Sequence, residues 1–579
     1  MTPCFWWQAA EMSPRVCPRS PGQINPTIID YSISDELPFN MFRESSDVPG
    51  MTPMTASIKM NSSLGFDVSN VANIQPQLYG AFGHIEYLPW IGLSYSLANF
   101  ATLSFARRIL DIFDIRHTYI ASILVFAAGA ALAGSAKSIS TIIAGRVVMG
   151  IGGSVCQNCA ISYFSMYASD SQGPLLYSIL SALWAVGLVV GGPVGSALAE
   201  KVTWRWAFYI NLPFLGFAFL CAVIFVPRRR APFNLPLRRR IAEFAGLDII
   251  LQTTTTIATI VLFAIAATFS GPVWSWSSGP CYATWAVFAV VFLICGVLHC
   301  KRFTVALRNG LNASSKDRPD RRVIPIELMG RRNTLPLWIV SGCAGATYAV
   351  TLYYLPLFYA FSKGHGALQQ TTRMLPFMLT FIATVVIVGV CLSKIKHYGV
   401  IYVVGGAVTL ASGTALAIIL DSDVSETKVM GLTALIGVGL GLHFQHGNAI
   451  SNMINKDLRD RVESAALLNM SLMGGISMAL IMAGAIYENR GMALLSSALQ
   501  AFHYDDEDLR EALGGVSPSV WEGAETKINE YGADATTRAI SSLLYIISSS
   551  GALCLACGVL ILLDMKLKRG YREKGIATV

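Results

Sequence analysis

From Trp90 onward, one apolar stretch of about twenty residues follows another, separated by short polar breaks. An α-helix rises about 1.5 Å per residue, so a helix of about 20 residues crosses the ~30 Å hydrocarbon core of a bilayer. The sequence therefore predicts an all-α membrane protein. About thirteen strong spans are expected, approximately at 90–106, 118–136, 140–168, 175–199, 206–226, 247–270, 280–299, 335–361, 372–393, 399–420, 429–452, 464–487 and 540–563.

Composition excludes the main alternatives to a membrane protein. Only 13% of the 579 residues are charged, 53% are hydrophobic, and the mean hydropathy is +0.52. Soluble domains carry roughly 25% charged residues, so a soluble enzyme is not expected. The 12 cysteines show no paired metal-ligand spacing in a polar context, so neither a disulfide scaffold nor a metal site is predicted.

The distribution of basic residues predicts the orientation of the spans. Alternate loops hold about 28 Lys and Arg residues in one set and about nine in the other, and the basic set is cytoplasmic. The net charge of +8 is therefore a topology signal, and no nucleic-acid partner is expected. Cytoplasmic N- and C-termini require an even number of spans. The polar segment 63–80, which contains Asp67, would supply the first of about fourteen.

A stripe of small residues lies in the predicted span 175–199. Gly187, Gly191 and Gly195 recur every four residues, and Pro193 lies among them. Glycines at this spacing share one helix face and let a second backbone approach closely, while a proline removes a backbone hydrogen bond and kinks the helix. Ordinary tight packing would produce the same pattern, so the stripe alone leaves both interpretations open.

Arg146 lies well inside the predicted span 140–168. A charge at this depth costs several kcal/mol unless it faces water or a partner, so Arg146 is a candidate functional residue or one half of a structural pair. The sequence has no G-x-x-x-x-G-K-[ST] phosphate loop and no H-E-x-x-H or G-x-S-x-G motif. The chain thus has no visible means of using ATP, and enzymatic activity is not expected.

These motifs resemble those of the major facilitator superfamily, and more narrowly its fungal fourteen-span drug:proton antiporter branch. The resemblance rests on Arg146 with the glycines after it, on the stripe around Pro193, and on the run Trp204-Arg-Trp-Ala-Phe-Tyr-Ile-Asn-Leu-Pro213. The Pro193 run is similar to the family's antiporter motif. The Arg146 run is similar to the motif associated with proton coupling.

The resemblance also implies a role for the cytoplasmic loop 107–116 and for the glycine stripe. Asp111 and Arg116 match the family's conformational loop motif, although a glycine is replaced by Arg107 and another by Asp114. Together with these two residues, the conformational motif comprises Gly187, Gly191, Pro193 and Gly195.

The fold implied by the resemblance is a major-facilitator bundle of two six-helix halves with two inserted helices and a first span that is short or divergent. The expected boundaries are a disordered cytoplasmic tail over 1–62, an N-terminal half over 63–226, and inserted helices 7 and 8 with basic loops over 227–334. A C-terminal half over 335–563, including an outer loop at 488–538, and a cytoplasmic tail over 564–579 complete the chain.

Proton coupling requires a group in the spans that changes its charge. Acidic residues there are essentially Asp67 and Asp248, so Asp67 is the leading carboxylate, with Arg146 and His446 as further candidates. A structural, hydrogen-bonded histidine is an equally valid interpretation of His446. The substrate-cavity candidates are aromatic or polar residues that could equally be packing or interfacial ones, namely Tyr353, Tyr354, His443, Gln445 and Asn448.

The sequence therefore predicts a secondary transporter that exports a small organic compound, such as a drug, toxin or secondary metabolite, in exchange for protons. A siderophore or nutrient porter of the same fold and a transport-incompetent or sensor-like membrane protein are the alternatives. The expected partners are the substrate, protons and the lipid bilayer, with the proton gradient as the energy source in place of a cofactor. The protein is expected to be a monomer in the plasma membrane, with the vacuolar membrane as the other possibility.

Overall fold

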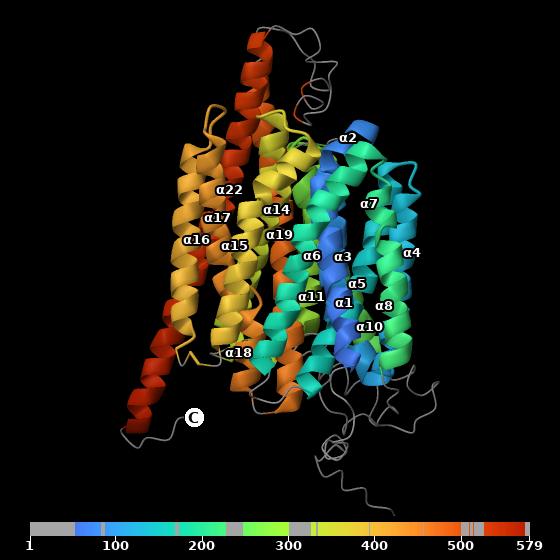
Figure 1. Ribbon diagram of the computed structural model, residues 1–579, viewed down its shortest axis with the longest axis vertical. Helices are drawn as coiled ribbons and strands as arrows, with labels where there is room; N and C mark the ends of the chain where they lie inside the picture. Colours follow the sequence, from blue (N-terminus) through green and yellow to red (C-terminus); the bar gives the residue numbers. More distant parts are fainter. Residues whose placement is uncertain are drawn as a thin grey trace, which may run out of the picture. The chain divides into compact units, whose positions relative to one another are not determined.

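In the computed structural model, helices make up the regular structure of the described part of the chain (Figure 1). The residues that the structure describes are 52–82, 87–167, 173–226, 247–271, 273–299, 326–331, 334–392, 394–395, 397–455, 457–498, 509, 513 and 526–573. All of them belong to the unit Pro49–Val579. Of the predicted disordered tail over 1–62, residues 1–51 lie outside the described residues, and so do residues 505–508 of the predicted outer loop.

The N-terminal half is built from the helices before residue 226. They are α1 (Thr52–Asn73), α2 (Gln75–Phe82), α3 (Leu88–Ile112), α4 (Ile115–Gly134), α5 (Ile139–Tyr167), α6 (Gly173–Lys201), α7 (Trp206–Tyr209) and α8 (Asn211–Phe225). Two long helices, α10 (Leu247–Phe269) and α11 (Gly279–His299), follow this half.

The C-terminal half begins after the short helix α13 (Ile326–Met329). Its helices are α14 (Thr334–Phe361), α15 (Ala367–Leu392), α16 (Gly399–Ile419), α17 (Glu426–His443), α18 (His446–Ile454), α19 (Leu458–Ala498) and α22 (Thr526–Glu573). In Figure 1 the long helices of both halves run roughly parallel to one another, as expected of a bundle that crosses a bilayer.

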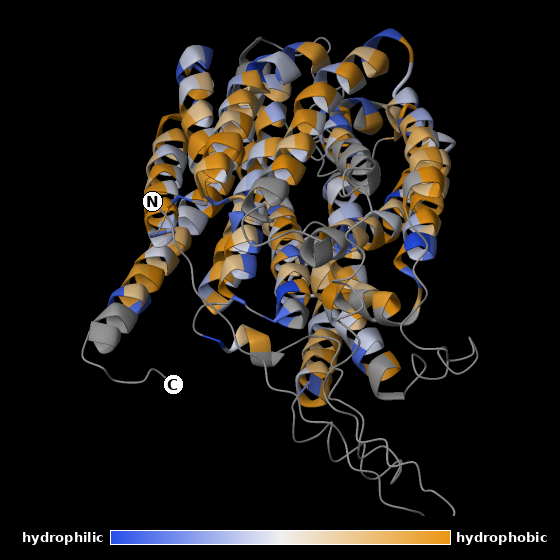
Figure 2. Cartoon of the chain, turned by 60° about the horizontal axis from the view of Figure 1, so that its bottom comes forward, coloured by the Kyte–Doolittle hydropathy of each residue, from blue (hydrophilic) through white to orange (hydrophobic). Residues whose placement is uncertain are grey.

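Twelve helices of the described residues are long and apolar enough to cross a membrane. Two more, α1 and α3, run in the same bundle but are more polar. Hydrophobic residues cover much of the length of the helices (Figure 2), and α11 exposes Phe292 and Leu293. Such exposure in a bundle is explained by lipid contact, because lipid tails are as apolar as these side chains. The chain is thus an all-α, multi-pass integral membrane protein.

The first span differs from the sequence prediction. Helix α1 begins at Thr52, so residues 52–62, which were predicted to belong to a disordered tail, are helical. At 22 residues, α1 is ~33 Å long, which is enough to cross the hydrocarbon core. The polar residues that hide this span from a hydropathy scan face inward, where Asp67, Asn70 and Asn73 are completely buried.

Two further boundaries differ from the prediction. The stretch 429–452 is not one helix but two, because α17 ends at His443 and α18 begins at His446. The predicted outer loop 488–538 is also shorter, since α19 continues to Ala498 and α22 begins at Thr526. Glu488 consequently lies on a helix.

Candidate functional site

A buried ion pair joins the two candidate charges of the N-terminal half. Asp67 on α1 and Arg146 on α5 are both 0% exposed, and Arg146 Nη1 lies 2.5 Å from Asp67 Oδ2. The other carboxylate oxygen, Oδ1, accepts a hydrogen bond of 2.9 Å from the amide of Asn211 on α8. A buried charge is tolerated only when it is paired and hydrogen-bonded, and this arrangement satisfies both oxygens of Asp67.

Arg146 is held by groups from α3 as well. Its Nε donates a hydrogen bond of 3.2 Å to the carbonyl of Ile91, and its guanidinium carbon lies 4.6 Å from the centre of the Tyr95 ring. A guanidinium over an aromatic face gains electrostatic energy from the ring quadrupole. The ion pair therefore ties together α1, α3, α5 and α8, and a change in the charge of Asp67 acts on all four helices.

The sequence identified both charges of this cluster but not their pairing, and it assigned no role to Asn211. Asn211 appeared only within the run that ends at Pro213. Asn211 could have been singled out from the sequence as an amide within an apolar stretch, because an amide at this depth needs a hydrogen-bonding partner. The side chain of Asp248, the other acidic residue of the predicted spans, lies outside the described part of the structure. Its ranking behind Asp67 as a proton-coupling carboxylate therefore stays a prediction.

A central cavity lies beside the ion pair, between the two halves of the bundle. Its lining comes from α1, α3, α5 and α6 on one side and from α14 and α19 on the other, and none of its lining residues is charged. They are Leu64, Val68, Tyr95, Ser96, Gln157, Trp184, Tyr348, Tyr353, Met473 and Ile476. The lining, mostly apolar and aromatic with a few polar groups, has the composition of a site for an organic compound, and the space left between these side chains in this conformation is about 20 Å³.

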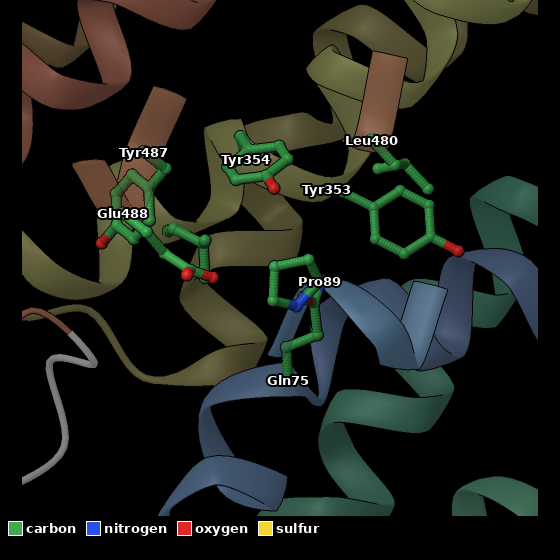
Figure 3. Close-up of a pocket in the computed structure, with 8 residues that line it drawn as sticks. Gln75, Pro89, Tyr353, Tyr354, Leu480, Tyr487 and Glu488 are labelled. Carbon is green, nitrogen blue, oxygen red and sulfur yellow. The ribbon is translucent and has the colours of Figure 1, made fainter. Parts of the chain in front are cut away.

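A second pocket begins on the other side of Tyr353, farther along α14 and α19 (Figure 3). Its lining residues are Gln75, Pro89, Tyr353, Tyr354, Leu357, Leu480, Tyr487 and Glu488. Tyr353 lines both spaces and also interacts electrostatically with Arg146 and Asp67. Of the five predicted cavity residues, Tyr353 and Tyr354 line a pocket, whereas His443, Gln445 and Asn448 line neither.

Polar contacts join the two halves on either side of the central cavity. The hydroxyls of Ser196 on α6 and Thr371 on α15 are 2.8 Å apart. Farther along α6, Ser181 donates to Gln445 Oε1 at 2.9 Å, and Gln157 on α5 donates to Asn469 on α19 at 3.2 Å. The halves are therefore in contact at both ends of the cavity in this conformation.

The glycine stripe of α6 packs directly against α1. A Cβ atom added at Gly191 would overlap the carbonyl of Phe66, and one added at Gly195 would overlap the side chain of Asn70. Pro193 lies inside α6 between these two contacts. The absence of side chains at these positions brings the α6 backbone close to the helix that carries Asp67. Gly187 is also buried on α6.

The break between α17 and α18 contains the polar cluster that the sequence singled out. Gln445 has a left-handed backbone with φ 56°, and Phe444 beside it stacks on Trp184 of the cavity at 5.1 Å between ring centres. His446 Nε2 lies 3.0 Å from the carbonyl oxygen of Gly441, which is a structural contact that bridges the break. His443 and Asn448 are buried on the two flanking helices.

The left-handed backbone at Gln445 leads to a prediction about stability. Gln445→Gly relieves the strain of a side chain at positive φ but loses the hydrogen bond to Ser181, so thermal unfolding is expected to change little. Gln445→Val, with a branched Cβ at the same φ, is expected to destabilise the purified protein by about 1–3 kcal/mol. Equal unfolding temperatures for the Gly and Val variants would contradict the backbone explanation.

The predicted conformational loop 107–116 is mostly helical, because α3 continues to Ile112 and α4 begins at Ile115. Arg116 Nη2 donates a hydrogen bond of 2.6 Å to the carbonyl of Val223, which anchors the start of α4 to the end of α8. Asp114 caps α4 by accepting from the Arg116 backbone N–H at 3.3 Å. The side chain of Asp111 lies outside the described part of the chain, so its predicted role stays a prediction.

The comparison with protein families accounts for this arrangement of helices. The model of the Major Facilitator Superfamily matches residues 60–277 and 242–482, which together make up most of the chain. The chain belongs to the major facilitator superfamily. It is therefore a membrane transporter, as the resemblance of its motifs predicted.

Similar proteins support the same conclusion. The chain is 28% identical over 495 residues to "Efflux pump DEP3" of Fusarium langsethiae, covering 85% of this chain and 86% of that protein. It is 27% identical over 526 residues to "Efflux pump alnA" of Emericella nidulans, covering 88% and 89%. The human organic anion transporter MFSD10 (TETRAN) has the same fold, with a TM-score of 0.54 at 12% identity, covering 89% of this chain and 99% of that one.

Proposed function

We propose that the protein exports a small organic compound in exchange for protons. The observation that carries the proposal is the position of the Asp67–Arg146 pair, whose neighbours Tyr95 and Tyr353 are walls of the central cavity. A titratable carboxylate that contacts the cavity wall can couple its protonation to the occupancy of that cavity. The names of the fungal relatives support export as the direction of transport.

The coupling step follows from the contacts of Asp67. A proton on the carboxyl removes its negative charge and leaves the Arg146 guanidinium without its counter-ion. A buried cation is then stabilised by another group, and Tyr95 and Tyr353 are the nearest candidates on the cavity side. Movement of Arg146 toward these rings changes the cavity wall. One half then rocks against the other, so that the contacts between the halves at Ser196 and at Ser181 break and form in turn. This motion opens the central cavity alternately to the two sides of the membrane.

The remaining properties follow from the same proposal. The proton gradient supplies the energy, no cofactor is required, and the working unit is a monomer in the plasma membrane with cytoplasmic termini. The length of α1 counts against the transport-incompetent alternative, because a first span that was expected to be short is long enough to cross the hydrocarbon core.

Accumulation measurements test the proposal. Expression in a fungal strain that lacks its own efflux pumps is expected to lower the cellular level of at least one compound from a panel of dyes and toxins. A proton uncoupler should restore that level, and Asp67→Asn should abolish the uncoupler-sensitive component. Gly216→Ala on α8 is the matched control, because a Cβ there meets no atom within 4 Å. Accumulation that never depends on the protein or on the uncoupler would refute proton-coupled export.

A further inference from the structure

The hairpin of the two inserted helices lies against both halves of the bundle. Helix α10 packs on α3 of the N-terminal half and on α19 of the C-terminal half, and its residue Ala264 is completely buried in the main core. Helix α11 packs on α10, and its exposed residues include Phe292 and Leu293. The hairpin is therefore attached to the bundle through α10, at the seam where α3 and α19 meet.

The turn that follows α10 has a fixed shape. The N–H of Trp274 donates a hydrogen bond of 2.9 Å to the carbonyl of Phe269, and the N–H of Gly271 donates one of 2.7 Å to the carbonyl of Trp274. The indole N–H of Trp285 on α11 donates to the hydroxyl of Ser270 at 3.0 Å. Because these bonds close the turn on itself, its residues contact the bundle as one unit.

The first residue of this turn contacts the N-terminal half. The ring centre of Phe269 lies 6.3 Å from that of Tyr87, at 86°, and 5.8 Å from that of Trp90, at 43°. Tyr87 directly precedes α3, and Trp90 lies in the first turn of that helix. Aromatic pairs at such distances attract each other beyond the burial of their surfaces. Two aromatic contacts therefore hold the turn to the start of α3.

The next two residues contact the C-terminal half. The side-chain amide of Asn489 on α19 donates a long hydrogen bond of 3.5 Å to the carbonyl of Ser270. Gly271 has a φ of 97°, and a Cβ atom at this position would overlap the side chain of Asn489. Glycine is thus favoured here by the left-handed backbone and by the close approach of α19. One long hydrogen bond and this close packing hold the turn to α19.

The same turn lies beside a closed part of the seam. A Cβ atom added at Gly484 of α19 would lie 3.0 Å from the ring of Pro89 on α3, so the two helices touch little more than one turn from Asn489. Pro89 also lines the second pocket, together with Tyr353. Separation of α3 from α19 at this level therefore opens the second pocket, and beyond Tyr353 the central cavity.

We propose that the turn Phe269–Trp274 is a clamp that holds α3 and α19 together and so keeps the central cavity closed toward the outer face. The inference rests on the proposed function, because it assigns the inserted helices a part in the rocking of the two halves. The predicted topology places the contacting parts of α3, α10 and α19 toward the outer face. When that face opens, the clamp releases one half. The long bond at Asn489 breaks before the two ring contacts of Phe269.

Hydrogen exchange of the purified full-length protein, followed by mass spectrometry, tests the clamp without requiring transport. Asn489→Ala is expected to speed exchange in the outer parts of α3 and α19 by about threefold to tenfold, because the clamp no longer opposes opening there. It should slow exchange at the inner contacts around Gln157 and Gln445, since outward opening closes the inner side. A variant that is only less stable would speed exchange at both ends.

A second variant and a control complete this measurement. Phe269→Ala removes the contacts with the other half and should give the same pattern as Asn489→Ala. Phe292→Ala removes the same ring from the same hairpin, where Phe292 is 57% exposed and pairs with Phe288 on its own helix, so it should change exchange at neither end. Unchanged exchange at the outer end in both clamp variants, or faster exchange at both ends, would overturn the inference.

A reversible cross-link tests the clamp in the opposite direction. Positions 271 and 489 are close enough for a disulfide in Gly271→Cys/Asn489→Cys, because a Cβ atom at 271 would touch the side chain of Asn489. Oxidation of this variant is expected to lower export severalfold, and dithiothreitol should restore it. Adding Phe269→Ala should restore export by the oxidised protein, because the cross-linked turn can then leave α3. Each single cysteine variant should be insensitive to oxidation.

These measurements separate the clamp from the proposed function. Hydrogen exchange reports on the clamp even if no tested compound is exported, whereas a wild-type protein that exports nothing contradicts the proposed function alone. Once mass spectrometry shows the disulfide in Gly271→Cys/Asn489→Cys, equal export by its oxidised and reduced forms would show that the turn does not hold the two halves together.

Discussion

Asp67→Asn is expected to destabilise the folded protein by about 3–5 kcal/mol, because it leaves the guanidinium of Arg146 buried without its counter-ion. Arg146→Met should cost a similar amount, since it leaves the carboxylate of Asp67 with only the amide of Asn211. Both single variants are expected to lose proton-coupled export. Thermal unfolding of the purified variants measures the first effect, and uncoupler-sensitive accumulation measures the second.

The double variant Asp67→Asn/Arg146→Met distinguishes a coupled pair from two independent residues. Removing both charges leaves no unpaired buried ion, so the double variant should be more stable than either single variant. It should still be inactive in export, because it has no group at this position that binds a proton. Additive losses of stability would show that the two residues do not depend on each other.

Gly191→Ala is expected to be nearly as damaging, although it adds a single methyl group. The new Cβ would overlap the backbone of Phe66, which is one residue before Asp67, and backbone atoms have no rotamer with which to move away. Overpacking of this kind typically costs about 1–3 kcal/mol, and here it pushes α6 away from α1. We expect a lower unfolding temperature together with reduced export.

Two comparisons test the explanation for Gly191. Gly216→Ala adds the same methyl group to a helix where no atom lies within 4 Å, so it should leave stability unchanged or raise it slightly. Gly195→Ala should have an intermediate effect, because the atoms it meets belong mainly to the side chain of Asn70, which can shift. Equal unfolding temperatures for the Gly191→Ala and Gly216→Ala variants would exclude close packing as the reason for the glycine.

Hydropathy located nearly all of the long helices. It was least informative at the segments that carry the candidate functional residues. The span that carries Asp67 is polar because its inner face holds the ion pair and buried amides, and this polarity lowers its hydropathy. The break at Gln445 was hidden for the opposite reason, since apolar residues continue on both sides of it. Glu488 was assigned to a loop because charge marks the end of a span in a hydropathy profile, whereas α19 continues to Ala498.

The sequence by itself determined the class of fold, the membrane setting and the small set of charged residues within the spans. Each of these can be read from a single helix, because a span must be apolar whatever its neighbours are. The tertiary structure decided which of those residues meet. Asp67 and Arg146 are separated by 79 positions and Asp67 and Asn211 by 144, and hydropathy carries no information on how two helices rotate toward each other. Pairing and pocket lining depend on that rotation, which close packing of small residues such as Gly191 fixes.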